Sequence, residues 1–152
     1  VRRRDLVSSV VLLAPTGPRS HYPQAGFRTL AAGYRVPVLS RAVRLVVERM
    51  FAAAGVPASL SDGEREAAVM DAAALDFAEH ATHLAALTQP TLVCWADDDP
   101  VIPSSIVTDL VALVPDAQPL HLRSGGHNVQ KTQARPIADA VVDFVARVEG
   151  DR

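Results

Sequence analysis

Residues 90–103 read PTLVCWADDDPVIP, and this stretch decides the fold. Residues 91–95 form an apolar run rich in strand-forming side chains, and a proline bounds the stretch at each end. This pattern is typical of a strand buried on both faces. Three carboxylates follow directly, those of Asp97, Asp98 and Asp99. Ligands of open parallel sheets bind at the carboxyl ends of the strands, and we expect the three aspartates at such an edge.

A histidine loop follows the next strand-like run. Residues 118–122 predict a strand, and residues 123–128 read RSGGHN. The two glycines allow a sharp turn, so His127 is expected just past the end of that strand. The order strand, acid, helix, strand, histidine loop is a βαβ unit, which brings an aspartate and His127 to one edge. Such a pair can form the hydrogen bond that fixes the imidazole tautomer and stabilises the protonated ring.

Residues 90–148 resemble the C-terminal end of proteins with the α/β-hydrolase fold. In that family an apolar strand ends in a pattern similar to W-G-x-x-D-P-x-x-P, and residues 95–103 read WADDDPVIP, with Ala96 at the glycine position. The resemblance implies that Asp99 is the acid of a Ser-His-Asp triad and that His127 is its base. The order of acid before histidine also agrees with the family.

The assignment of the acid has alternatives within the same run. Asp98 and then Asp97 are the other candidates for the triad acid, and either can instead cap the loop or accept its backbone N–H groups. Burying all three carboxylates together would be unfavourable, because neighbouring like charges raise one another's pKa. Asn128 and Gln130 follow His127 and are expected to orient its loop.

The other parts of such an enzyme do not occur in these 152 residues. The sequence holds no G-x-S-x-G nucleophile elbow and no HGGG-like oxyanion loop, and it begins with Val rather than Met. In the family both motifs lie upstream. We therefore interpret residues 1–152 as the C-terminal half of one α/β-hydrolase domain. The expected architecture is a parallel sheet of about three strands with flanking helices and a helical cap insertion at about residues 25–88.

The periodicity of apolar residues predicts the remaining elements. The expected helices are residues 38–54, 62–75, 76–87, 104–114 and 136–148, and the expected first strand is residues 6–13. Ser61 and Glu64 have the spacing of a capping box at the start of the second helix.

The resemblance implies an esterase-like hydrolase whose serine comes from a missing N-terminal half. It would hydrolyse an ester, thioester, amide or C–C bond of a small, rather apolar molecule. The sequence identifies no substrate-binding residue. The alternative is a truncated, non-catalytic module that binds a partner. In either case the first strand would leave an apolar edge, through which a second copy or the missing half can pair.

Composition narrows the remaining classes. The net charge is −2 and 49% of the residues are hydrophobic, which gives no reason to expect a nucleic acid or a membrane as partner. The single cysteine, Cys94, lies in the buried strand and is interpreted as a core residue. The sequence shows no signal peptide and no apolar run that could span a bilayer, so we expect a cytoplasmic protein.

No cofactor and no metal are expected. His80 and His83 have helical i, i+3 spacing, but the pattern places no further ligand beside them. They are interpreted as surface or packing residues, with the lining of a pocket as the alternative. His21 and Tyr22 lie on the loop of residues 16–24, where contact with substrate is the alternative to simple exposure.

Overall fold

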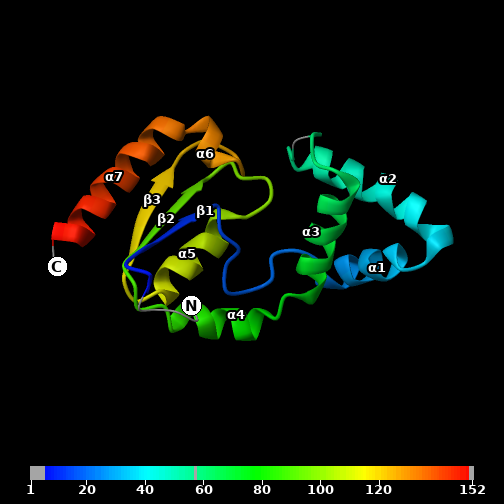
Figure 1. Cartoon of the computed structure of the whole chain (residues 1–152), viewed down its shortest axis with the longest axis horizontal. Helices are drawn as coiled ribbons and strands as arrows, with labels where there is room; N and C mark the ends of the chain where they lie inside the picture. Colours follow the sequence, from blue (N-terminus) through cyan, green and yellow to red (C-terminus); the bar gives the residue numbers. More distant parts are fainter. Residues whose placement is uncertain (1–5, 57, 151–152) are drawn as a thin grey trace. The chain divides into compact units, whose positions relative to one another are not determined.

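The computed structural model describes residues 6–56 and 58–150, and its contacts divide the chain into two compact units (Figure 1). The unit that we call the sheet unit holds the residues up to Arg19 and those from Phe77 onward. The helical unit is Ser20–Asp76. The helical unit is therefore inserted in the sequence between the first strand and the remainder of the sheet unit.

The sheet unit is built on three parallel strands, which confirms the predicted fold class. They are β1 (Val10–Leu13), β2 (Thr91–Ala96) and β3 (Ala117–Leu122). Their order is β1-β2-β3, so the apolar run of residues 91–96 forms the central strand, and all six of its residues are buried. The register pairs Ala96 with Leu122 at the carboxyl end. The loops that follow β2 and β3 therefore leave the sheet at the same level.

Helices cover both faces of this sheet, as a parallel sheet requires. They are α4 (Phe77–Ala85), α5 (Ser104–Leu113), α6 (Val129–Thr132) and α7 (Ala134–Gly150). Val93 and Trp95 of β2 pack in one cluster with residues of α4 and α5. Leu92 and Cys94 point to the opposite face and pack on Phe144 of α7. This alternation along β2 is the ordinary period of a strand.

The helical unit packs three helices around a core of its own. They are α1 (Gln24–Tyr34), α2 (Pro37–Ala53) and α3 (Asp62–Ala74). Tyr34, Val47 and Val69 are buried together in this core. The capping box at the start of α3 is present: the Ser61 hydroxyl accepts the backbone N–H of Glu64, and the Glu64 carboxylate accepts that of Ser61. These bonds satisfy two donors that a helix start otherwise leaves unpaired.

Several boundaries differ from the sequence predictions. The first strand begins at Val10 rather than at residue 6, because Val10 pairs with Thr91, the first residue of β2. The helices α1 and α6 were not predicted. Two glycines weaken the helix propensity of α1, and α6 is too short to show a period. Cys94 is buried, and its burial raises the pKa of the thiol to about 11, as suits a core residue.

The helix α4 was expected to be part of the insertion of residues 25–88. Instead it packs with the sheet unit, where Leu84 joins the cluster of Val93 and Trp95. The helical unit is accordingly shorter than the expected insertion. That this unit acts as a cap stays a prediction.

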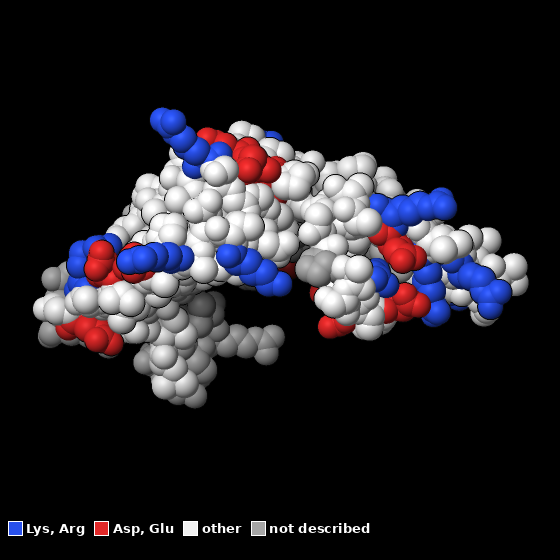
Figure 2. Space-filling model, turned by 90° about the horizontal axis from the view of Figure 1, so that it is seen from above, with Lys and Arg blue, Asp and Glu red and all other residues white. Residues whose placement is uncertain are grey.

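Charges of both signs are mixed on the molecular surface seen in Figure 2, where coloured Lys and Arg side chains lie beside Asp and Glu in both units. Within residues 6–56 and 58–150, none of the helices combines the length and the hydropathy that crossing a bilayer requires.

Replacing Gly17 by alanine is expected to destabilise the sheet unit by about 1–3 kcal/mol, the usual cost of overpacking. Gly17 is buried, and a Cβ there would lie 2.5 Å from the carbonyl oxygen of Ile106 and would also clash with its side chain. Gly63→Ala is the matched control, because nothing lies within 4 Å of its added Cβ. Urea unfolding measures both variants, and equal losses of stability would contradict the packing described for Gly17.

Candidate active site

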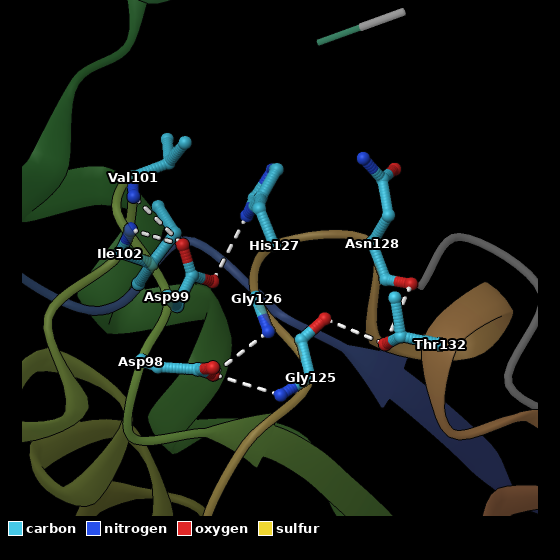
Figure 3. A network of polar contacts seen from close by, with 9 residues as sticks. All are labelled: Asp98, Asp99, Val101, Ile102, Gly125, Gly126, His127, Asn128 and Thr132. Carbon is cyan, nitrogen blue, oxygen red and sulfur yellow. Dashed lines mark hydrogen bonds and ion pairs between the residues drawn. The ribbon is translucent and has the colours of Figure 1, made fainter. Parts of the chain in front are cut away.

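Asp99 lies in the loop that follows β2, at the carboxyl edge of the sheet (Figure 3). Its side chain is 2% exposed. Its Oδ1 accepts the backbone N–H groups of Val101, at 2.7 Å, and of Ile102, at 3.0 Å. The carboxylate is therefore fixed by its own loop, which leaves Oδ2 to face another partner.

That partner is His127. Its Nδ1 lies 3.0 Å from Oδ2 of Asp99, and its side chain is 32% exposed. The structure thus brings together the two residues that the sequence singled out, from loops 28 residues apart. A buried carboxylate on Nδ1 holds the imidazole in one tautomer and stabilises the protonated ring, so the ring can accept a proton at Nε2.

The environment of Asp99 keeps its carboxyl group ionised. Burial acts to raise the pKa of this carboxyl, but the hydrogen bonds from His127, Ile102 and Val101 outweigh burial and lower the pKa below its usual value. Asp99 is therefore a carboxylate at neutral pH, in contact with an imidazole. This is the charge arrangement in which an acid supports a general base.

The lowered pKa of Asp99 makes a prediction for acid stability. A carboxyl with a lowered folded pKa stabilises the native state above its unfolded pKa, and this stabilisation is lost as the pH falls through the folded pKa. We expect the free energy of unfolding to decline less steeply in Asp99→Asn than in the wild type below about pH 5. Urea unfolding at a series of pH values measures both slopes. Identical slopes would show that the ionisation of Asp99 is not coupled to folding.

Asp98 binds the backbone of the histidine loop rather than a side chain. Its Oδ1 accepts the N–H groups of Gly125 and Gly126, each at 2.8 Å (Figure 3). On the other side of the same turn, the Thr132 hydroxyl donates to the carbonyl oxygen of Gly125 at 2.6 Å. Of the alternatives left open for Asp98, the structure shows the one in which it meets backbone N–H groups.

Asp97 forms a second acid–imidazole pair, which sequence reasoning missed. Its Oδ1 lies 2.6 Å from Nε2 of His121 and accepts the Ser104 hydroxyl at 3.1 Å. Trp95 stacks on His121 with ring centroids 4.8 Å apart and donates its indole N–H to Ser104. The hydrogen bond from His121, followed by that from Ser104, lowers the pKa of Asp97. One signal was available, because a parallel register that pairs the carboxyl ends of the two strands sets His121 beside Trp95.

The loop residues that were candidates for substrate contact have partners within their own unit. The Tyr22 hydroxyl donates to the backbone carbonyl of Ala72 at 2.9 Å, and its ring meets Phe27 edge to face. The His21 ring in turn lies edge to face on Tyr22. These contacts give both residues a packing role in the helical unit.

The two helical histidines also have contacts of their own. Nε2 of His80 lies 3.2 Å from the backbone carbonyl oxygen of Thr16, and Nε2 of His83 lies 3.9 Å from Glu79. Within the described part of the chain, no cluster of three or more His, Cys, Asp or Glu residues could hold a metal ion.

Asn128 precedes the short helix α6, and that Asn128 and Gln130 orient the histidine loop stays a prediction. The backbone carbonyl oxygen of Asn128 accepts the N–H groups of Lys131 and Thr132, the last two residues of α6. His127 therefore lies between the glycine turn that contacts Asp98 and the helix α6, which starts at Val129.

Sequence comparison gives one curated relative. No protein-family model matches the chain. This chain is 35% identical over 69 residues to a 2-hydroxy-6-oxononadienedioate/2-hydroxy-6-oxononatrienedioate hydrolase of Cupriavidus pinatubonensis. That match spans 45% of this chain and about a quarter (24%) of the relative.

Structural comparison matches nearly the whole chain. An enol-lactonase from Burkholderia xenovorans aligns with a TM-score of 0.67 at 17% identity, over 95% of this chain and 58% of its own. An esterase from Exiguobacterium antarcticum aligns with a TM-score of 0.64 at 14% identity, over 92% and 57%. The chain has a partial α/β-hydrolase fold. Because it spans a little under three fifths of these α/β hydrolases, the match agrees with the predicted C-terminal portion of that fold.

Within the α/β-hydrolase fold, the bromoperoxidase of Bacillus anthracis aligns at a TM-score of 0.57 and 17% identity, over 91% of this chain and 58% of its own. Proteins with this fold therefore include one named for a different reaction. Fold likeness at such identities says nothing about the reaction of this chain, which has to be argued from its own residues.

Proposed function

We propose that this chain supplies the acid and the general base of a hydrolase. The observation that carries the proposal is the 3.0 Å contact between the buried carboxylate of Asp99 and the partly exposed ring of His127. The contact lies where parallel strands end, which is the usual place for a ligand in such sheets. The curated relative, itself named a hydrolase, supports the same class of reaction.

In the proposed mechanism a serine from an N-terminal portion attacks the substrate carbonyl. Nε2 of His127 takes the proton of the serine hydroxyl and returns it to the leaving group, while Asp99 on Nδ1 stabilises the imidazolium that forms. Water then repeats the attack on the acyl-serine, with His127 again as the base. The nucleophile is assigned outside these 152 residues because the sequence holds no G-x-S-x-G motif.

We propose a small carbonyl compound as substrate of the whole protein. The curated relative is by name a hydrolase of a hydroxy-oxo dioate. Esters, lactones and the C–C bond beside a ketone share an electrophilic carbonyl that an activated serine attacks. The helical unit is the proposed cap, since it is inserted in the chain between β1 and the two strands that carry the site.

The outer edge of β1 is the proposed place for the N-terminal portion. Among the described residues β1 pairs with β2 alone, so its other edge has N–H and C=O groups free to accept a strand. A second copy of the chain is the alternative occupant. Size-exclusion chromatography of the 152-residue chain is expected to show self-association, and a stable monomer at high concentration would contradict this part of the proposal.

The test of the proposed function is an assay of the chain joined to the segment that precedes it. We expect turnover of short p-nitrophenyl esters by the joined protein and none by the 152-residue chain alone. A folded joined protein without turnover of esters, thioesters or activated ketones would contradict the hydrolase proposal. It would favour the non-catalytic binding module.

A further inference from the structure

The three consecutive aspartates each bind a different part of the sheet unit. Asp97 contacts Ser104 of α5 and His121 of β3. Asp99 contacts its own loop and the ring of His127. Asp98 alone of the three accepts backbone N–H groups of the histidine loop. The backbone of that loop is therefore tied to the acid loop through the carboxylate of Asp98.

The turn before His127 has a shape that suits one negatively charged acceptor. Gly125 has φ +156° and Gly126 has φ +62°, so both lie in the region that favours glycine. Their two successive N–H groups converge on a single oxygen of Asp98, at 2.8 Å each. Consecutive backbone N–H groups arranged in this way form a concave site for an anion. Two adjacent glycines are also unusually free to change conformation when nothing holds them.

We infer that Asp98 is a positioning residue for His127: its carboxylate holds the Gly125–Gly126 turn in the conformation that presents the imidazole to Asp99. On the opposite side of the turn, the Thr132 hydroxyl donates a hydrogen bond to the Gly125 carbonyl oxygen (Figure 3). An error of about 1 Å in the placement of a catalytic group can cost a hundredfold in rate. The catalytic consequence of this inference rests on the proposed function, whereas the structural consequence does not.

Asp97 provides a matched control for Asp98. The two neighbours carry the same charge on the same loop, but Asp97 contacts His121 and not the glycine turn. Asp98→Ala removes the acceptor, whereas Asp98→Asn keeps an acceptor oxygen and removes the charge. The glycine turn should therefore be disturbed most in Asp98→Ala, less in Asp98→Asn and not at all in the wild type. Asp97→Ala should disturb His121 instead.

The experiment uses NMR of the whole 152-residue chain in these variants. Hydrogen exchange of the Gly125 and Gly126 amides reports the turn, and the Nδ1–H proton signal of His127 reports its bond to Asp99. In Asp98→Ala we expect the Gly125 and Gly126 amides to exchange at least about tenfold faster, which corresponds to a loss of about 1.4 kcal/mol of protection. We also expect the Nδ1–H signal of His127 to disappear. We expect Asp97→Ala to leave both readouts of the turn and of His127 unchanged.

The outcomes separate this inference from the proposed function. A His127 ring signal retained in Asp98→Ala would overturn the inference, and so would its equal loss in Asp97→Ala. If Asp98→Ala does not fold, Asp98→Asn decides by the same two signals. In the joined protein, Asp98→Ala should lower kcat with little change in KM, and Asp98→Asn should recover part of the loss. An absence of ester turnover in the wild type would refute the hydrolase proposal while the NMR result stands.

Discussion

Replacing His127 by alanine in the joined protein is expected to lower kcat for ester hydrolysis by about 10⁴-fold. The imidazole is the base that takes the serine proton and the acid that returns it, and Asp99 cannot do either from its buried position. Most of the loss should appear in kcat rather than KM, since the ring acts in the transition state. Initial rates on p-nitrophenyl acetate measure the effect.

His83→Ala is the control for this substitution. His83 is 69% exposed on α4, so its removal should leave kcat within about twofold, as is usual for surface changes. Asp99→Asn should also lower kcat strongly, and adding it to His127→Ala should cost little more, because residues that act as a unit are not additive. Turnover that survives His127→Ala unchanged would remove this residue from the mechanism.

Replacing Phe144 by alanine is expected to lower the free energy of unfolding by about 3–5 kcal/mol. Phe144 is fully buried, and it packs on Leu92 and Cys94, on the face of β2 that α7 covers. Truncation removes the largest fully buried side chain of the molecule's described part and leaves a cavity against the central strand. Since small domains are stable by only about 5–15 kcal/mol, this loss would be a large fraction of the total.

Val142→Ala is the matched control, because it shortens a side chain on the same helix two residues away. Val142 is 67% exposed, and its truncation should change stability by no more than about 0.5 kcal/mol. Urea unfolding followed by circular dichroism measures both variants. Similar losses for Phe144→Ala and Val142→Ala would mean that α7 does not pack on the sheet as described.

The fold and the central pair of the site could be predicted because their signals are local. An apolar run in a stretch bounded by prolines favours a strand buried on both faces, and β2 is the buried central strand of the sheet. Because β2 and β3 end at the same edge of the sheet, the loops that follow them bring Asp99 close to His127. The sequence favours Asp99 over Asp98 and Asp97 as the acid, and of the three carboxylates only that of Asp99 is buried.

The remaining features depend on contacts that one stretch of sequence does not encode. The different partners of Asp97, Asp98 and Asp99 depend on where β3 and the histidine loop lie in space. The helix α1 has weak propensity and is held by packing of Tyr34 against α3 residues such as Val69. The place of α4 is likewise set by tertiary packing, because an amphipathic pattern shows that a helix has a buried face but not which partner covers it.

The most direct test of the central claim is covalent labelling of the joined protein with a fluorophosphonate, followed by intact and peptide mass spectrometry. The account predicts one adduct, on a serine outside these 152 residues, and a labelling rate at least about a hundredfold lower in His127→Ala. Labelling that proceeds equally fast without His127, or a folded joined protein that takes up no label, would contradict it.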